Sequence, residues 1–157
     1  MMEALLEALA QSGIAQYLRF SRWGYATVNT AHVFSIALLV GSIFTMDLKL
    51  FGAWPRLAHD TLVRVLLPMA FCGLLIALIT GPLLFLTRPI EYIALGIFQL
   101  KLALIVIGAL SAMVAHLVYG LWLEQADRPA RLRIGVISLL CWLGALVAGR
   151  MIAFAGP

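Results

Sequence analysis

Four long apolar segments, separated by short polar stretches, dominate the pattern of this chain. They cover about residues 25–48, 62–86, 97–123 and 133–154, and each reaches the roughly 20 apolar residues that a membrane-crossing helix needs. The stretches between them, such as FGAWPRLAHDT and EQADRPARL, carry proline, glycine and charge, as turns at a membrane surface do. Short connections make consecutive helices antiparallel neighbours. The pattern therefore predicts an all-α integral membrane protein, an antiparallel four-helix bundle over residues 23–157.

The first 22 residues have a different pattern. Polar residues are interspersed among apolar ones there, and Glu3 and Glu7 stand where a signal peptide would carry positive charge. We therefore expect residues 1–22 to form an amphipathic helix in the membrane interface rather than a fifth span. Aromatic residues flank the apolar segments, as they do at membrane surfaces: Trp23, Tyr25, Trp54, Tyr92, Tyr119 and Trp122.

Composition and charge agree with a membrane protein. Hydrophobic residues make up 64% of the chain and charged residues 11%, against about 45–50% and about 25% in soluble domains. The cationic residues stand singly near the ends of apolar segments, which is typical of helix anchors and not of nucleic-acid binding. Six lysines and arginines flank the first and third loops, against three on the opposite side. This bias predicts a multi-pass membrane protein whose first and third loops are cytoplasmic and whose termini both lie on the outer side of the membrane.

Four ionisable residues lie inside the apolar segments: His32, Lys101, His116 and Arg150. Such residues are costly in a membrane and usually have a function. From the helical rise, His32, Lys101 and Arg150 lie ~7, ~12 and ~10 Å from the middle of their segments, all toward the outer side. His116 lies ~10 Å toward the other side, so ~18 Å of depth separates the two histidines. They cannot be the two axial ligands of one haem. Asp47 is expected at the cytoplasmic edge, paired with Lys49, Arg64 or an arginine of the third loop.

The helix faces that carry these residues suggest a flat ligand. His32 shares its face with Ser35, and Lys101 shares its face with the small residues Gly108 and Ala112. Small residues let helices pack closely, and they also leave room for a ligand.

A porphyrin between helices needs a basic ligand, space, and cations for its propionates. We therefore predict a haem b site with His32 as iron ligand and Lys101 and Arg150 near the propionates. The predicted lining includes Ser35, Gly108 and Ala112. The second ring nitrogen of the histidine should donate to the Val28 carbonyl or the Asn29 side chain. His116 is a candidate ligand for a second haem or a metal ion, with Met46 nearby, so that one or two haems are expected.

Most of the chain after residue 20 resembles a family of small bacterial four-span membrane proteins. The resemblance is carried by RWGYATVNTAHVFSIALLVGSIFTMDLKLFG, GPLLFL, FQLKLALIVIGALSAMVAH and AGRMIAF. The resemblance implies that the chain lies in the bacterial inner membrane, so that the outer side is the periplasm and both termini are periplasmic. The order of its histidines and lysine is also similar to HemJ-type protoporphyrinogen oxidases and, more distantly, to CopD-type copper-resistance membrane proteins. The HemJ-type pattern implies that His32 and Lys101 take part in haem b binding and activity. After the first span this chain has DLKLFG where that pattern has aromatic and arginine residues, so the resemblance points to haem binding more than to that oxidation.

Two functions remain open at this stage. The first is a cytochrome b-like protein that passes electrons to or from quinone or a periplasmic redox partner. The second is a haem-free protein, either an accessory subunit of a larger membrane complex or a CopD-like copper handler that uses His and Met. A homo-oligomer fits both. No catalytic residue is identified, because the sequence has no nucleotide-binding loop, nucleophile elbow or zinc spacing.

Overall fold

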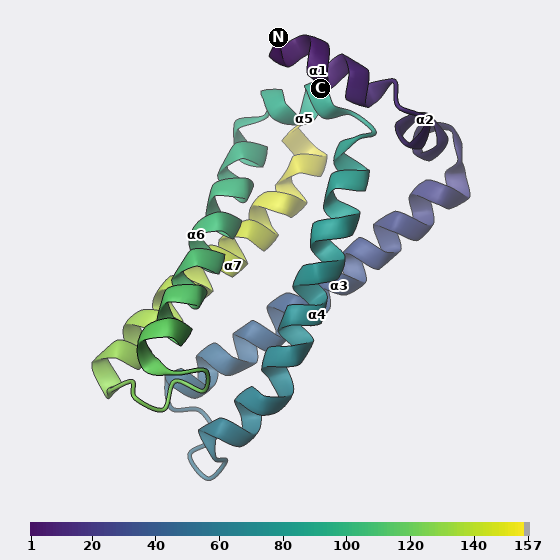
Figure 1. Ribbon diagram of the computed structural model, residues 1–157. Helices are drawn as coiled ribbons and strands as arrows, with labels where there is room; N and C mark the ends of the chain where they lie inside the picture. The colour runs from purple at the N-terminus through teal and green to yellow at the C-terminus, as the bar shows by residue number, and fades with distance from the viewer. Residues whose placement is uncertain (156–157) are drawn as a thin grey trace.

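The computed structural model describes residues 1–155, except for the side chains of residues 2, 3 and 59, and within this range it contains helices and no strand. The helices are α1 (Met2–Ala10), α2 (Gly13–Phe20), α3 (Arg22–Leu50), α4 (His59–Phe85), α5 (Pro89–Ala94), α6 (Gly96–Tyr119) and α7 (Arg128–Ala155). Figure 1 shows the four long helices, α3, α4, α6 and α7, running in alternating directions. The predicted all-α antiparallel four-helix bundle is confirmed.

All four long helices are apolar enough and long enough to cross a membrane. The shortest, α6, has 24 residues and so extends ~36 Å, more than the hydrocarbon thickness of ~30 Å. The chain is a multi-pass membrane protein.

Two helix ends differ from the predicted segments. The third segment was predicted to reach residue 123, but α6 ends at Tyr119 because Gly120 adopts a φ of +86°, in the left-handed region that favours glycine. The fourth helix begins at Arg128, five residues earlier than predicted. There the Asp127 carboxylate accepts a hydrogen bond from the Ala130 amide at 2.9 Å and satisfies the first turn.

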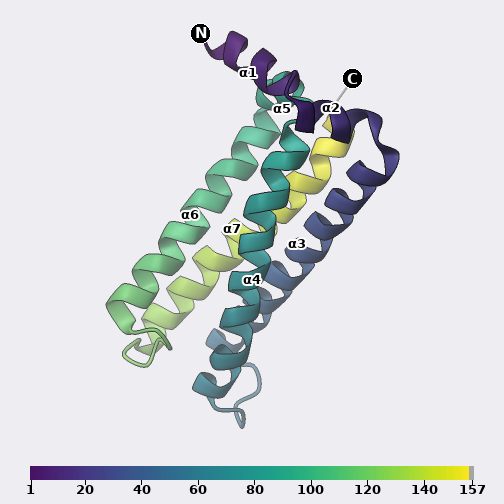
Figure 2. The ribbon, with the colours of Figure 1, turned by 45° about the vertical axis from the view of Figure 1, so that its right-hand side comes forward.

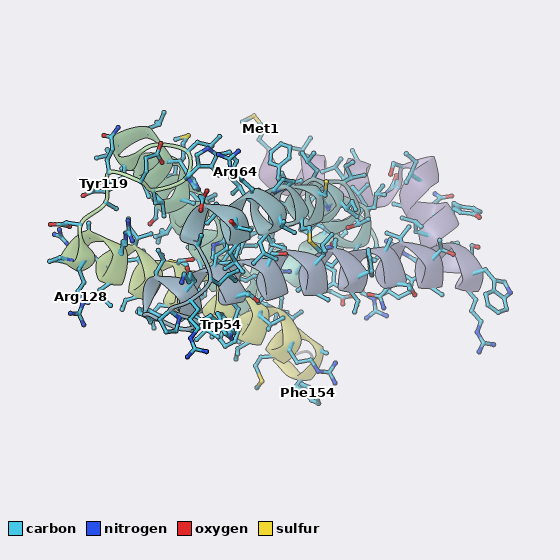
Figure 3. All side chains as sticks on the ribbon, turned by 90° about the horizontal axis from the view of Figure 1, so that it is seen from below. Met1, Trp54, Arg64, Tyr119, Arg128 and Phe154 are labelled. Carbon is cyan, nitrogen blue, oxygen red and sulfur yellow. The ribbon has the colours of Figure 1, made fainter. Side chains whose placement is uncertain are left out.

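The long helices form a row rather than a closed square. The helix α3 packs on α4 and on α7, and α7 packs on α6, whereas α4 and α6 make little direct contact. A set of stacked rings, Phe85, Tyr92 and Phe98, links α4 and α6 through α5, with centroids between 5.6 and 6.4 Å apart. At the opposite end the Arg64 guanidinium lies 4.9 Å from the Trp122 ring centroid. Figure 3 views the molecule from that opposite end, with Arg64 and Tyr119 labelled.

Close approach of α3 and α4 depends on Gly73. A Cβ atom at this position would lie 2.7 Å from the Leu39 amide nitrogen and 2.8 Å from the Ser35 carbonyl oxygen. Neither backbone atom can move without moving α3, so only glycine fits here. Small residues at helix contacts are typical of membrane bundles.

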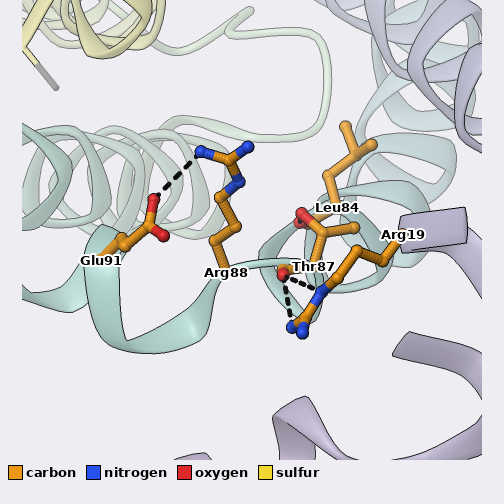
Figure 4. A network of polar contacts seen from close by, with 5 residues as sticks. All are labelled: Arg19, Leu84, Thr87, Arg88 and Glu91. Atoms are coloured by element: carbon orange, nitrogen blue, oxygen red, sulfur yellow. Dashed lines mark hydrogen bonds and ion pairs between the residues drawn. The ribbon is translucent and has the colours of Figure 1, made fainter. Parts of the chain in front are cut away.

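The N-terminal 22 residues form two helices where the sequence predicted one. The break falls at Ser12, whose side-chain oxygen accepts from the Ala15 amide at 3.3 Å and caps α2. Figure 4 shows how α2 is held to the bundle: the Arg19 guanidinium donates two hydrogen bonds, of 3.1 and 2.8 Å, to the Thr87 carbonyl. Figures 1 and 2 place α1, α2 and α5 together at one end of the bundle. This is the α5 end, and the end with the α3–α4 and α6–α7 connections is the loop end.

Candidate functional site

A pocket of about 810 Å³ lies beside His32 toward the α5 end. Its volume falls in the range of about 300–1,000 Å³ that is typical of small-molecule sites. Its lining comes from α3, α4, α5, α6 and α7 and is mostly apolar. Among the lining residues, Val33 of α3 and Leu146 of α7 are exposed, so the pocket opens toward the lipid-facing surface between these helices. The polar lining residues are Tyr25, Asn29, His32, Tyr92, Lys101 and Arg150.

The hydrogen bonds around Thr80 fix the tautomer of His32. The imidazole Nδ1 lies 2.7 Å from the Thr80 hydroxyl oxygen. That hydroxyl gives its only hydrogen to the Ile76 carbonyl, also at 2.7 Å, because a carbonyl can only accept. The Thr80 oxygen must therefore accept from Nδ1–H of His32. The neutral ring then carries a lone pair on Nε2, and this nitrogen has no hydrogen-bond partner among the described residues.

The partner of Nδ1 differs from the predicted one. The sequence placed it on the same helix, at Val28 or Asn29, whereas the structure places it on α4. The difference arises because α4 packs along α3 and brings Thr80 and Gly81 close to the ring. A Cβ at Gly81 would lie 3.4 Å from the imidazole Cε1, so α4 covers that edge of the ring closely.

Lys101 and Arg150 line the same pocket as His32, on α6 and α7. The half-buried Lys101 side chain lies across Gly149, where a Cβ would be 3.5 Å from its Cε and 3.7 Å from its Nζ. Arg150 is exposed at the rim, and its guanidinium lies 5.1 Å from the ring centroid of Phe154, which projects from α7 in Figure 3. The helical rise predicts that Lys101 and Arg150 lie in one layer with His32, and all three residues line this one pocket.

The structure does not bring the three predicted lining residues to this pocket. Ser35 is fully buried and its hydroxyl donates to the His32 carbonyl at 2.7 Å. Gly108 is covered by the Trp142 ring, whose Cε2 would lie 3.3 Å from an added Cβ, so the small face of α6 serves close packing with α7. Ala112 lines a different cavity, described below. The space for a ligand lies between α3 and α7 instead.

A second hollow, of about 740 Å³, adjoins the pocket at the α5 end and shares Tyr25 and Tyr92 with it. Its lining carries Arg19, Arg22 and Arg88, so the entrance at the membrane surface is basic. Burial raises the pKa of the Tyr92 phenol above its ordinary value, so this hydroxyl keeps its proton to a higher pH than an exposed tyrosine does. Arg88 pairs with Glu91 at 3.2 Å (Figure 4).

The second intramembrane histidine lies elsewhere. His116 lines a cavity of about 230 Å³ toward the loop end, together with Asp47 and Ala112. The prediction that Asp47 is paired at the surface is wrong, because Asp47 is only 4% exposed and its Oδ2 has no partner among the described residues. The expected partners are engaged elsewhere: Lys49 donates to the Trp54 carbonyl at 2.8 Å and Arg64 stacks on Trp122.

The helical period carries no signal for the burial of Asp47. It follows His32 by 15 residues, which at 100° per residue places it about 60° from His32 on the helix. The other buried residues of α3, namely Ser35, Leu39 and Ser42, lie on the opposite side of His32, so Asp47 stands about 80–140° away from them. Its burial therefore does not follow from a buried face that these residues define.

No three histidine, cysteine, aspartate or glutamate side chains gather closely enough to hold a metal ion in the part of the chain that the structure describes. The metal-site prediction for His116 thus gains no further ligand of these types. Comparisons of the chain with protein-family models, curated proteins and solved structures find no match in any of the three. A function for this chain therefore has to come from the chemistry of the His32 pocket itself.

Proposed function

We propose that this chain is a membrane-embedded b-type haem protein of the bacterial inner membrane, with Nε2 of His32 as an axial ligand of the iron. The observation that carries the proposal is the unprotonated Nε2 beside a pocket of about 810 Å³. A ligating histidine normally donates its other ring N–H to a fixed acceptor, and Thr80 supplies that acceptor here. Bound haem b supplies one-electron redox chemistry within the bilayer.

The other side chains that line the pocket suit the propionates and the macrocycle of haem. Lys101 and Arg150 supply cationic donors for two propionate carboxylates, and the guanidinium can bind a carboxylate through two parallel hydrogen bonds. The rings of Phe85 and Phe98 supply apolar surface for the macrocycle and exclude water.

We propose one haem. The cavity beside His116 has about 230 Å³, below the range of small-molecule sites, whereas the His32 pocket lies well within that range. Electrons would enter or leave at the α5 end, where the basic entrance faces the periplasm in the proposed orientation. A quinone or a periplasmic redox protein with acidic groups fits that position.

The absorption spectrum of the detergent-purified protein tests this proposal. We expect a Soret band in the wild-type protein that shifts on reduction, and its loss in His32→Ala. The matched control is His116→Ala, which removes the other intramembrane histidine and should keep most of the band; a loss of about half would instead indicate two haems. A wild-type protein without haem, or His32→Ala with full haem content, would show that His32 is only a packed core residue.

A further inference from the structure

The cavity beside His116 lies toward the loop end of the bundle and is lined by all four long helices. Most of its lining is apolar, and its polar side chains come from three helices: Asp47 of α3, Ser111 and His116 of α6, and Ser138 of α7. This cavity is separate from the His32 pocket, because Asp47 follows His32 by 15 residues, or ~22 Å along α3.

Two buried polar atoms in this cavity lack a hydrogen-bond partner, Oδ2 of Asp47 and Nδ1 of His116. They do not pair directly, since the ion pair found in the described residues is Arg88–Glu91. Among the described lining residues, α3 contributes one titratable group, Asp47, α6 contributes His116, and α4 and α7 contribute none. No lysine or arginine of this described lining neutralises the carboxylate.

A lone charge in such a place is unfavourable. An unpaired carboxylate in an apolar interior loses its hydration without compensation, and so does an unpaired imidazolium. One proton shared by the two groups removes both problems. Either the carboxyl and the imidazole are neutral, or both are charged and the pair is neutral overall. A second proton, or the loss of the first, leaves one isolated charge.

Water can connect the two groups. A buried water needs two to four polar partners, and its share of liquid volume is about 30 Å³. Asp47, His116 and the two serine hydroxyls supply the partners, and the cavity of about 230 Å³ is large enough for several waters.

We propose that Asp47 and His116, bridged by water, form one proton-binding site that exchanges protons with the aqueous phase at the loop end. Asp47 stands one turn before the end of α3 and His116 one turn before the end of α6. Leu50, which lines this cavity, also borders a hollow at the loop surface that contains Lys49, Arg128 and Arg131. A proton leaving the pair therefore has a short path to surface water.

Two spectroscopic signals report on the pair in the full-length protein in lipid nanodiscs. The chain has three histidines, so the ¹⁵N imidazole signals of His116 can be assigned by substitution. The infrared carboxyl bands of Asp47 are assigned by their loss in Asp47→Asn. The matched control is Asp60→Asn, which removes an exposed aspartate from the first turn of α4.

We expect coupling in both directions. Asp47→Asn should change the protonation state that the His116 signals report, and His116→Gln should shift the Asp47 band, while Asp60→Asn changes neither. Transfer into D₂O should shift the Asp47 band, because the site exchanges with water. If one of the variants Asp47→Asn and His116→Gln fails to fold, the other still tests the coupling.

Three results would overturn the proposal. The His116 signals and the Asp47 band could each be insensitive to loss of the other residue, which would make the groups independent. The carboxyl band could remain unshifted in D₂O, which would mean that the cavity is closed to water. Signals that respond to added zinc or copper salt but not to pH would identify a cation site instead.

Discussion

The two ring nitrogens of His32 have different environments, and this difference decides what the residue can do. Nδ1–H is held by Thr80 on the neighbouring helix, whereas Nε2 has no hydrogen-bond partner among the described residues, and the residue lines the pocket. A neutral imidazole held in one tautomer can act as a ligand or as a proton acceptor without placing a bare charge in the membrane. Thr80 is thus a positioning residue for His32.

Replacing Thr80 with valine tests that role. The valine keeps the shape of the side chain but leaves the buried Nδ1–H without an acceptor, which should cost about 1–3 kcal/mol of unfolding free energy. If haem is bound, its affinity should fall by about 10- to 100-fold. Thermal unfolding and haem titration measure the two effects.

The control for this experiment is Thr45→Val on α3. The Thr45 hydroxyl donates to the Gly41 carbonyl four residues earlier, as the Thr80 hydroxyl does to Ile76, but it holds no side chain of another helix. Equal effects of Thr45→Val and Thr80→Val would show that the His32 contact contributes nothing.

At the residue scale, depth could be predicted from the sequence and contacts could not. Counting residues brought His32, Lys101 and Arg150 to one layer, because the helical rise is constant. Gly108 was predicted to line the ligand pocket, but the Trp142 ring covers it. The helical period shows which residues share a face of α6, but it does not show which helix packs against that face. The burial of Asp47 has no signal in the helical period, because that period places it about 80–140° from the other buried residues of α3.

At the scale of helices, one glycine sets the distance between α3 and α4. Gly73→Ala places a methyl group against the Leu39 amide and the Ser35 carbonyl and forces the helices apart. We expect it to lower the unfolding free energy by about 1–3 kcal/mol. It should also disturb the His32 contact, since Thr80 lies on α4 two turns further on. Unfolding in detergent by heat or denaturant provides the measurement.

Gly41→Ala is the matched variant for Gly73→Ala. A Cβ at Gly41 meets nothing within 4 Å, so alanine there should be neutral or slightly stabilising, by up to about 1 kcal/mol. If the two variants are equally stable, Gly73 does not control the approach of the helices.

At the scale of the whole molecule, the proposed orientation places the α5 end in the periplasm and the loop end in the cytoplasm. In a background without Cys72 and Cys141, we expect Arg88→Cys to react with an impermeant maleimide in intact spheroplasts. Arg128→Cys should react only after lysis, because it lies at the other end of the bundle. Reaction of both residues from the same side would contradict the four-span topology. Reaction of Arg128→Cys in intact spheroplasts and of Arg88→Cys only after lysis would show that the protein has the opposite orientation.

The existence of four spans could be predicted, whereas their packing order could not. Run length and hydrophobicity decide whether a helix crosses the membrane. Neighbours in space were predicted from short loops, and this holds for α3 with α4 and for α6 with α7. It fails for α4 and α6, which make little direct contact beyond the stacking of Phe85 on Phe98 at the α5 end. The pairing of α3 with α7, which forms the His32 pocket, has no signal in the hydrophobic pattern.

The central claim is that the His32 imidazole itself ligates haem iron, and chemical rescue tests it most directly. His32→Gly removes the ring and leaves space where free imidazole can bind. We predict that the purified variant lacks the Soret band when reconstituted with haem alone and regains it when imidazole is added, while His116→Gly keeps the band throughout. A His32→Gly protein that binds haem as well as the wild type without added imidazole would contradict the account.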